Sequence, residues 1–144
     1  MNSVFIIDTN VVVAGLLTNH ADSPLARILD GMLHPSIRFA LSEALLAEYR
    51  GVLLPPKLLR LHQLAKSEIY TISTILTRHP TVLPVPPQFN ALVAPDVDDQ
   101  FLWNLLNSRE DLLLVTRDKL LLLQTGPLQA RVMAPLEFAR QVLG

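Results

Sequence analysis

The fold class of this chain is decided by residues 4–10, which have the sequence VFIIDTN. The first four form a short, continuous apolar run rich in β-branched residues, which is typical of a strand buried on both faces of a parallel sheet. Asp8 follows this run directly and ends it. In open α/β sheets, ligands bind beyond the carboxyl ends of the strands, so Asp8 is expected where a binding site can form.

The rest of the chain continues with strands that alternate with helices. The expected strands are 37–41, 82–85, 112–115 and 131–133. The expected helices are 24–33, 43 to about 54, two packed helices through 58–64 and 69–76, 98–108, a short turn near 119 and a last helix from 135. Ser42 is a suitable N-cap for the second of these helices. This order predicts an α/β domain with a mainly parallel sheet.

The composition indicates one domain without a strong overall charge. At 144 residues, 50% of them hydrophobic, the chain has the size of a single domain over residues 1–144. Five prolines between residues 80 and 95 are interpreted as a stiff surface connector, because neither side would make an independent domain. The 12 Lys and Arg residues against 13 Asp and Glu residues give a formal net charge of −1, so any nucleic-acid contact must be local.

The sequence favours a cytoplasmic protein with no membrane contact. It contains no cysteine, which excludes disulfides and thiolate metal sites and fits a reducing compartment. Asp8 interrupts the first apolar run well before the length of a signal peptide or a membrane span is reached.

A second carboxylate follows another expected strand. Asp118 lies just beyond residues 112–115, separated from them by Thr116 and Arg117. It can therefore reach the same sheet edge as Asp8. Taken singly, each residue also has an ordinary structural explanation, since Asp8 could form an Asx-turn and Asp118 could cap a short helix.

A third carboxylate is expected from the helix near residue 98. Asp98 lies three and four residues before the first members of the apolar stripe formed by Phe101, Leu102, Leu105 and Leu106. We therefore expect its side chain to face inward. Asp96 and Asp99 are better explained by capping and by the macrodipole at a helix N-terminus, and could assist at most.

Glu48 follows the same logic in the helix after Ser42. Ala44, Leu45 and Val52 lie at helical spacing from it, which places a carboxylate on a packing face. Burying an unpaired carboxylate costs several kcal/mol, so the group must find a cation, take a proton or bind a metal. An ion pair with an arginine is the ordinary alternative.

Four acids from separate segments thus point toward one end of one sheet, where they would repel one another without a counterion. Carboxylate oxygens are the ligands that Mg²⁺ or Mn²⁺ requires, so the sequence predicts a metal site of Asp8, Glu48, Asp98 and Asp118. Histidine offers no competing site, because the four histidines have no zinc-like i, i+4 spacing.

The sequence resembles the PIN-domain family of nucleases, and within it the VapC-type toxins of toxin–antitoxin pairs. The resemblance spans nearly the whole chain. Its pieces are Ile7-Asp8-Thr9-Asn10, Ser42 followed by Glu48-Tyr49, Asp96-Val97-Asp98-Asp99-Gln100-Phe101-Leu102, Val115-Thr116-Arg117-Asp118 and Ala134-Pro135-Leu136-Glu137-Phe138.

The resemblance implies a three-layer α/β/α sandwich of about five strands, whose clustered acids bind Mg²⁺ or Mn²⁺ and hydrolyse phosphodiester bonds, usually in RNA. Asn10 and Thr116 match accessory polar positions that would orient an acid. Asp99 could replace Asp98 if the helix starts one residue later. Arg117 and Lys119 are candidates for holding substrate phosphates, although two solvated charges beside a helix start are an equally good explanation. A cognate antitoxin and a homodimer are further implications.

Two other functions are considered. A haloacid-dehalogenase-type phosphatase also begins with an aspartate after the first strand, but it needs a second aspartate where this chain has Asn10. A PIN-like binding module that has lost its activity is the non-enzymatic alternative, and the presence of all four acids gives it no support.

Overall fold

The computed structural model describes residues 4–34, 37–53, 74, 81–83, 85, 92–124 and 126–143. The strands of this part of the chain are β1 (Val4–Ile7), β2 (Ala40–Leu41), β3 (Thr81–Val82), β4 (Leu112–Val115) and β5 (Val132–Met133). The α-helices are α1 (Thr9–Leu17), α2 (Pro24–Leu33), α3 (Glu43–Leu53), α6 (Gln100–Asn107), α7 (Lys119–Leu123) and α8 (Pro135–Val142). Two 3₁₀ turns, η1 (Val97–Asp99) and η2 (Gln129–Arg131), complete the elements.

The strands pair in parallel throughout. β1, β4 and β5 form one sheet in the order β1-β4-β5, and β2 pairs with β3. Within the described residues, one parallel bridge between Phe5 and Phe39 joins the two groups, and the Phe5 amide donates to the Arg38 carbonyl at 2.9 Å. The resulting order is β3-β2-β1-β4-β5, which confirms the expected α/β class with a parallel sheet.

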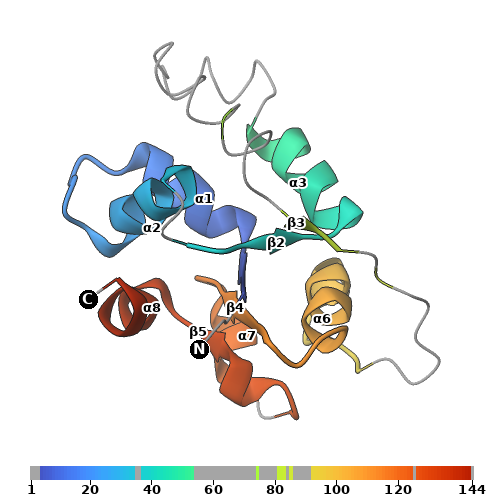
Figure 1. Cartoon of the computed structure of the whole chain (residues 1–144). Coiled ribbons are helices and arrows are strands. Elements are labelled where there is room, and N and C mark those ends of the chain that lie inside the picture. The colour runs from blue at the N-terminus through green and yellow to red at the C-terminus, as the bar shows by residue number, and fades with distance from the viewer. Residues whose placement is uncertain are drawn as a thin grey trace.

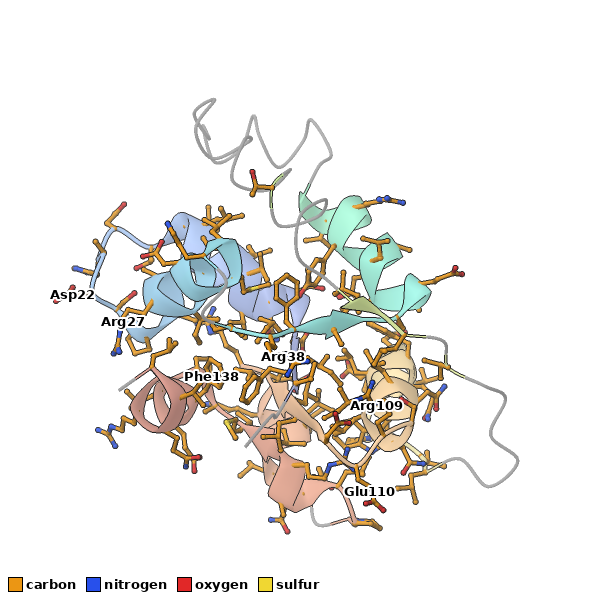
Figure 2. All side chains as sticks on the ribbon, viewed as in Figure 1. Asp22, Arg27, Arg38, Arg109, Glu110 and Phe138 are labelled. Carbon is orange, nitrogen blue, oxygen red and sulfur yellow. The ribbon has the colours of Figure 1, made fainter. Side chains whose placement is uncertain are left out.

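Helices pack on both flanks of the strands. Figure 1 shows α2 beside α8 on one flank and α3 beside α6 on the other, and both pairs are in contact. The core lies between them and includes Ile6 and Ile7, which are fully buried, as the all-apolar β1 predicts. Phe138 points from α8 toward the centre of the molecule (Figure 2), where its ring meets that of Phe5 edge-on at 4.6 Å between centroids.

Helix α1 was not expected from the sequence. Three consecutive valines, residues 11–13, do not show the spacing of an amphipathic helix. The helix forms because it is covered on several sides: Val11 and Val12 are buried, and α1 contacts both α2 and α3. Gly15 permits the close approach to α2, since a Cβ there would lie 2.9 Å from the Leu25 carbonyl oxygen. Tertiary packing therefore overrides local preference here.

Several element boundaries differ from the expected ones. β2 is shorter than 37–41, β3 begins one residue before 82 and does not include Val85, and β5 starts at Val132 because Arg131 belongs to η2. α2, α3, α7 and α8 match their expected ranges to within a residue or so. The helices expected through 58–64 and 69–76 lie outside the described residues apart from residue 74. Within the described residues, no helix is long and apolar enough to cross a membrane.

Candidate active site

The carboxyl ends of β1 and β4 bring two of the expected acids together. Ile7 and Val115 are register partners, so Asp8 and the segment after Val115 leave the sheet side by side. The Asp8 amide still donates to the Val115 carbonyl at 2.9 Å, which extends the ladder one residue further. Asp8 itself is buried, with 5% of its surface exposed.

The hydroxyl of Thr116 links Asp8 to Asp118. It donates to Oδ2 of Asp8 at 2.7 Å and accepts the backbone amide of Asp118 at 3.0 Å, and Thr116 is fully buried. Asn10 makes a parallel link, because its Oδ1 accepts the Arg117 amide at 3.3 Å. The two accessory residues therefore hold the start of α1 against the segment after β4.

Asp118 serves as a cap and as a member of the acid group. Its Oδ1 accepts the Leu120 amide at 2.9 Å as the N-cap of α7. It also raises the pKa values of Asp8 and Asp99 by charge repulsion. The capping explanation is confirmed for this residue, and the cap leaves Asp118 among the acids of the predicted site.

Asp99, and not Asp98, is the acid of this segment that interacts with the others. Asp98 is exposed, and its amide donates to Oδ1 of Asp96 at 2.9 Å. The expectation that Asp98 faces inward with the stripe is wrong because residues 97–99 form a 3₁₀ turn, and the α-helix starts only at Gln100. A 3₁₀ turn has 3.0 residues per turn, so α-helical spacing cannot be counted backward through it. Asp96 caps this turn, as expected for a helper at a helix start.

The environment of Asp99 raises its pKa to about 7. Burial is the largest cause, followed by a side-chain hydrogen bond to Asp118 and by the charges of Asp118, Asp8 and Asp96. Two carboxyl groups that share a hydrogen bond hold a proton between them, because both cannot ionise at short range without a compensating cation.

Glu48 reaches the same group of acids from α3. It is half-buried, and burial followed by the charge of Asp8 raises its pKa, while the Thr9 hydroxyl lowers it. The ordinary alternative was an ion pair with an arginine. Within the described ranges the ion pair of the structure is Arg109–Asp111, and Glu48 has no such partner there.

Two residues near Glu48 stand within the quoted family motifs but were given no role of their own from the sequence. Tyr49 is fully buried, and its hydroxyl donates to the carbonyl of Ile7, the residue before Asp8. Thr9 is also buried, and its hydroxyl lies near Glu48 without a hydrogen bond of regular geometry. Both are adjacent in sequence to a predicted site acid, which is the one signal that could have singled them out.

The expected phosphate contacts lie at the rim of the site. Arg117 and Lys119 flank Asp118 in sequence, and both side chains are exposed. The interpretation as solvated charges beside a helix start fits this exposure as well as a substrate role does.

The donor set fits a hard divalent cation, although the side chains are not arranged as a ready coordination sphere. Among the residues that the structure describes, no three His, Cys, Asp or Glu side chains lie close enough together to hold a metal ion as they stand. All the acids concerned offer oxygen ligands, and burial raises the pKa of Asp8, although the Thr116 hydroxyl and the Thr9 and Asn10 amides partly offset this. A divalent ion would compete with the proton that the raised pKa of Asp99 favours, and it would offset the repulsion among the acids.

Comparison with known proteins agrees with this fold. A family model for the PIN domain matches residues 4–120, a segment that contains Asp8, Glu48, Asp99 and Asp118. No curated protein and no solved structure matches the chain. Since the matched segment covers most of the 144 residues, the chain belongs to the PIN-domain family, whose members are generally metal-dependent nucleases.

Proposed function

We propose that this chain is an endoribonuclease that hydrolyses RNA phosphodiester bonds with Mg²⁺ or Mn²⁺. The observation that carries the proposal is the meeting of four acids at the carboxyl ends of β1 and β4. The pKa values of Asp8, Glu48 and Asp99 are all raised, and their main charged neighbours are other acids of the group. A buried group of this kind lowers stability unless a ligand compensates it, so a cationic ligand explains its presence.

The residues proposed to hold the ion are Asp8, Glu48, Asp118 and Asp99, with Asp99 in place of Asp98. When bound, the metal would lower the pKa of a water molecule and offset the charge that grows on the phosphate during attack. The chain supplies no covalent nucleophile in this proposal, which is consistent with the lack of cysteine.

The other residues of the site position these groups. The Thr116 hydroxyl fixes the Asp8 carboxylate, and the Asn10 amide side chain fixes the backbone at Arg117. Arg117 and Lys119 are exposed beside the acids, so they can hold the phosphates on either side of the cleaved bond.

We also propose that the chain is the toxin of a type II toxin–antitoxin pair, acting in the cytoplasm as a homodimer and bound by a cognate antitoxin. The support is the order of motifs in the sequence, which resembles that of VapC-type toxins. Expression of the wild-type chain should arrest growth, and Asp8→Asn should not. Growth arrest that is equal for both would contradict the toxin role as a nuclease.

The proposed activity is tested with purified chain and labelled single-stranded RNA, with Mg²⁺, Mn²⁺ or EDTA. We expect cleavage with either ion, none with EDTA and none by Asp8→Asn. Single-stranded DNA and p-nitrophenyl phosphate are parallel substrates, and hydrolysis of the phosphate ester with RNA left intact would favour a phosphatase. Mn²⁺ binding without cleavage of any nucleic acid would favour a binding module.

A further inference from the structure

One buried hydrogen bond connects the helix that carries Glu48 to the strand that carries Asp8. Tyr49 follows Glu48 in α3, and its hydroxyl donates to the carbonyl of Ile7, the last residue of β1. Tyr49 is fully buried, so no water can take over this bond. The bond therefore fixes the backbone on both sides of the Glu48–Asp8 gap, one residue away from each acid.

The surroundings of the hydroxyl place it close to both acids. Burial is the main cause that raises the pKa of Tyr49 well above its ordinary value, and the charges of Asp8 and Glu48 follow. Consecutive residues of an α-helix point about 100° apart, so Tyr49 can be buried against β1 while the half-buried Glu48 beside it directs its carboxylate toward Asp8. Among the described residues, the Thr9 hydroxyl makes no hydrogen bond of regular geometry, although it lies near Glu48 and lowers the pKa of that residue.

We propose that Tyr49 is a positioning residue that holds Glu48 at its distance from Asp8, and so sets the affinity of the site for a divalent cation. This inference rests on the proposed function, since it concerns the same acids. Groups that orient metal ligands change metal affinity by about 10- to 100-fold when they are removed. Tyr49→Phe keeps the ring in the core and removes only the hydroxyl, so it isolates this role.

The test measures Mn²⁺ binding to the full chain by titration calorimetry, with no substrate present. Four proteins form a double-mutant cycle: wild type, Tyr49→Phe, Glu48→Gln and the double variant. We expect Tyr49→Phe to weaken Mn²⁺ binding about 10-fold, and to change it less than about 2-fold when Glu48 is already glutamine. Glu48→Asp replaces Glu48→Gln as the background if binding by the latter is too weak to titrate.

A stability control separates positioning from loosening of the fold. Phe138→Leu removes ring contacts between α8 and Phe5 in the core and touches neither α3 nor an acid of the group, so it should lower the melting temperature and leave Mn²⁺ affinity unchanged. Equal affinity of wild type and Tyr49→Phe, or the same loss in both Glu48 backgrounds, would overturn the inference and leave the proposed function standing. A wild-type chain that binds no Mn²⁺ would overturn both.

Discussion

The two ends of the same parallel sheet differ in whether their charged side chains are compensated by partners. At the carboxyl end, burial and the charges of neighbouring acids raise the pKa values of Asp8, Glu48 and Asp99. At the amino end, charges are compensated. Arg131 donates to the backbone carbonyls of Leu106, Arg109 and Leu112, and Arg109 pairs with Asp111. Figure 2 shows Arg109 near the end of α6.

This difference separates residues that stabilise the fold from residues that strain it. The carbonyls bound by Arg131 come from the end of α6, the loop after it and the start of β4, so one side chain joins three segments. At the other end, the acids would be more stable apart. Substitutions at the two ends should therefore move activity and stability in different directions.

The largest expected effect is on cleavage by Asp8→Asn. Loss of this carboxylate should reduce metal-dependent RNA cleavage more than about 100-fold. Removal of groups that only orient metal ligands already lowers metal affinity or activity by about 10- to 100-fold. The melting temperature of the metal-free protein should stay the same or rise, because a repelling charge is removed. The matched control is Asp111→Asn at the amino end, which should cleave like wild type. Cleavage by Asp8→Asn at the wild-type rate would remove the contrast between the two ends.

The next effect is on stability, at Arg131. Arg131→Met removes the hydrogen bonds to three carbonyls, and we expect the free energy of unfolding in urea to fall by about 2 kcal/mol. Mn²⁺ affinity at a temperature where the variant is folded should not change. A loss of Mn²⁺ binding without a loss of stability would mean that the amino end is coupled to the site.

A smaller effect concerns pH and metal-free stability. Asp99 has a folded-state pKa of about 7 against an ordinary value of 3.8, so between these values the folded chain holds a proton that the unfolded chain has lost. A rise in pH between about 3.8 and 7 therefore favours the unfolded state. We expect the melting temperature without metal to fall by a few degrees from about pH 4 to above pH 7.

Asp99→Asn provides the control for this pH dependence. The variant should show a smaller fall in melting temperature over the same range, because the amide does not titrate. Saturating Mn²⁺ should also reduce the fall, since the ion competes with the proton. A wild-type melting temperature that rises steadily from pH 4 to 7 in EDTA would contradict the raised pKa.

The smallest effect is expected at Thr9. Its buried hydroxyl lacks a regular hydrogen bond, so Thr9→Val should keep the shape and raise the free energy of unfolding by about 0.5 kcal/mol or leave it unchanged. Urea denaturation of the metal-free protein measures this, with Thr116→Val as the control. Thr116→Val should lose stability, because its hydroxyl bonds both Asp8 and the Asp118 amide. Equal losses in the two variants would show that the Thr9 hydroxyl has a partner.

The sequence predicts those residues of the site whose position follows from the end of a single strand or from the spacing of a single helix. Asp8 and Asp118 could be placed because each follows an apolar run, and parallel strands put their carboxyl ends at one edge. Glu48 could be placed from helical spacing because α3 is regular through that residue. The same reasoning chose Asp98 over Asp99 because local spacing does not reveal where a 3₁₀ turn gives way to an α-helix.

Contacts between distant segments could not be predicted in this way. The bond from Tyr49 to Ile7 joins residues 42 positions apart, and no periodicity of either segment encodes it. Helix α1 is a similar case, since its three valines favour a strand and its helical state comes from contacts with α2 and α3. Single-sequence patterns report local preference, and these features are decided by tertiary packing.

The single bridge between Phe5 and Phe39 gives the sheet a seam. Asp8, Asp99 and Asp118 belong to segments that pack on β1 and β4, whereas Glu48 follows β2 on the other side of the seam. A ligand held by Glu48 and Asp8 together would crosslink the two groups of strands where the described backbone joins them by one bridge. Ligand binding then favours the state in which β1 and β2 are paired, by mass action. Hydrogen exchange at the amides of residues 39–41 would therefore slow as the ligand is bound more tightly.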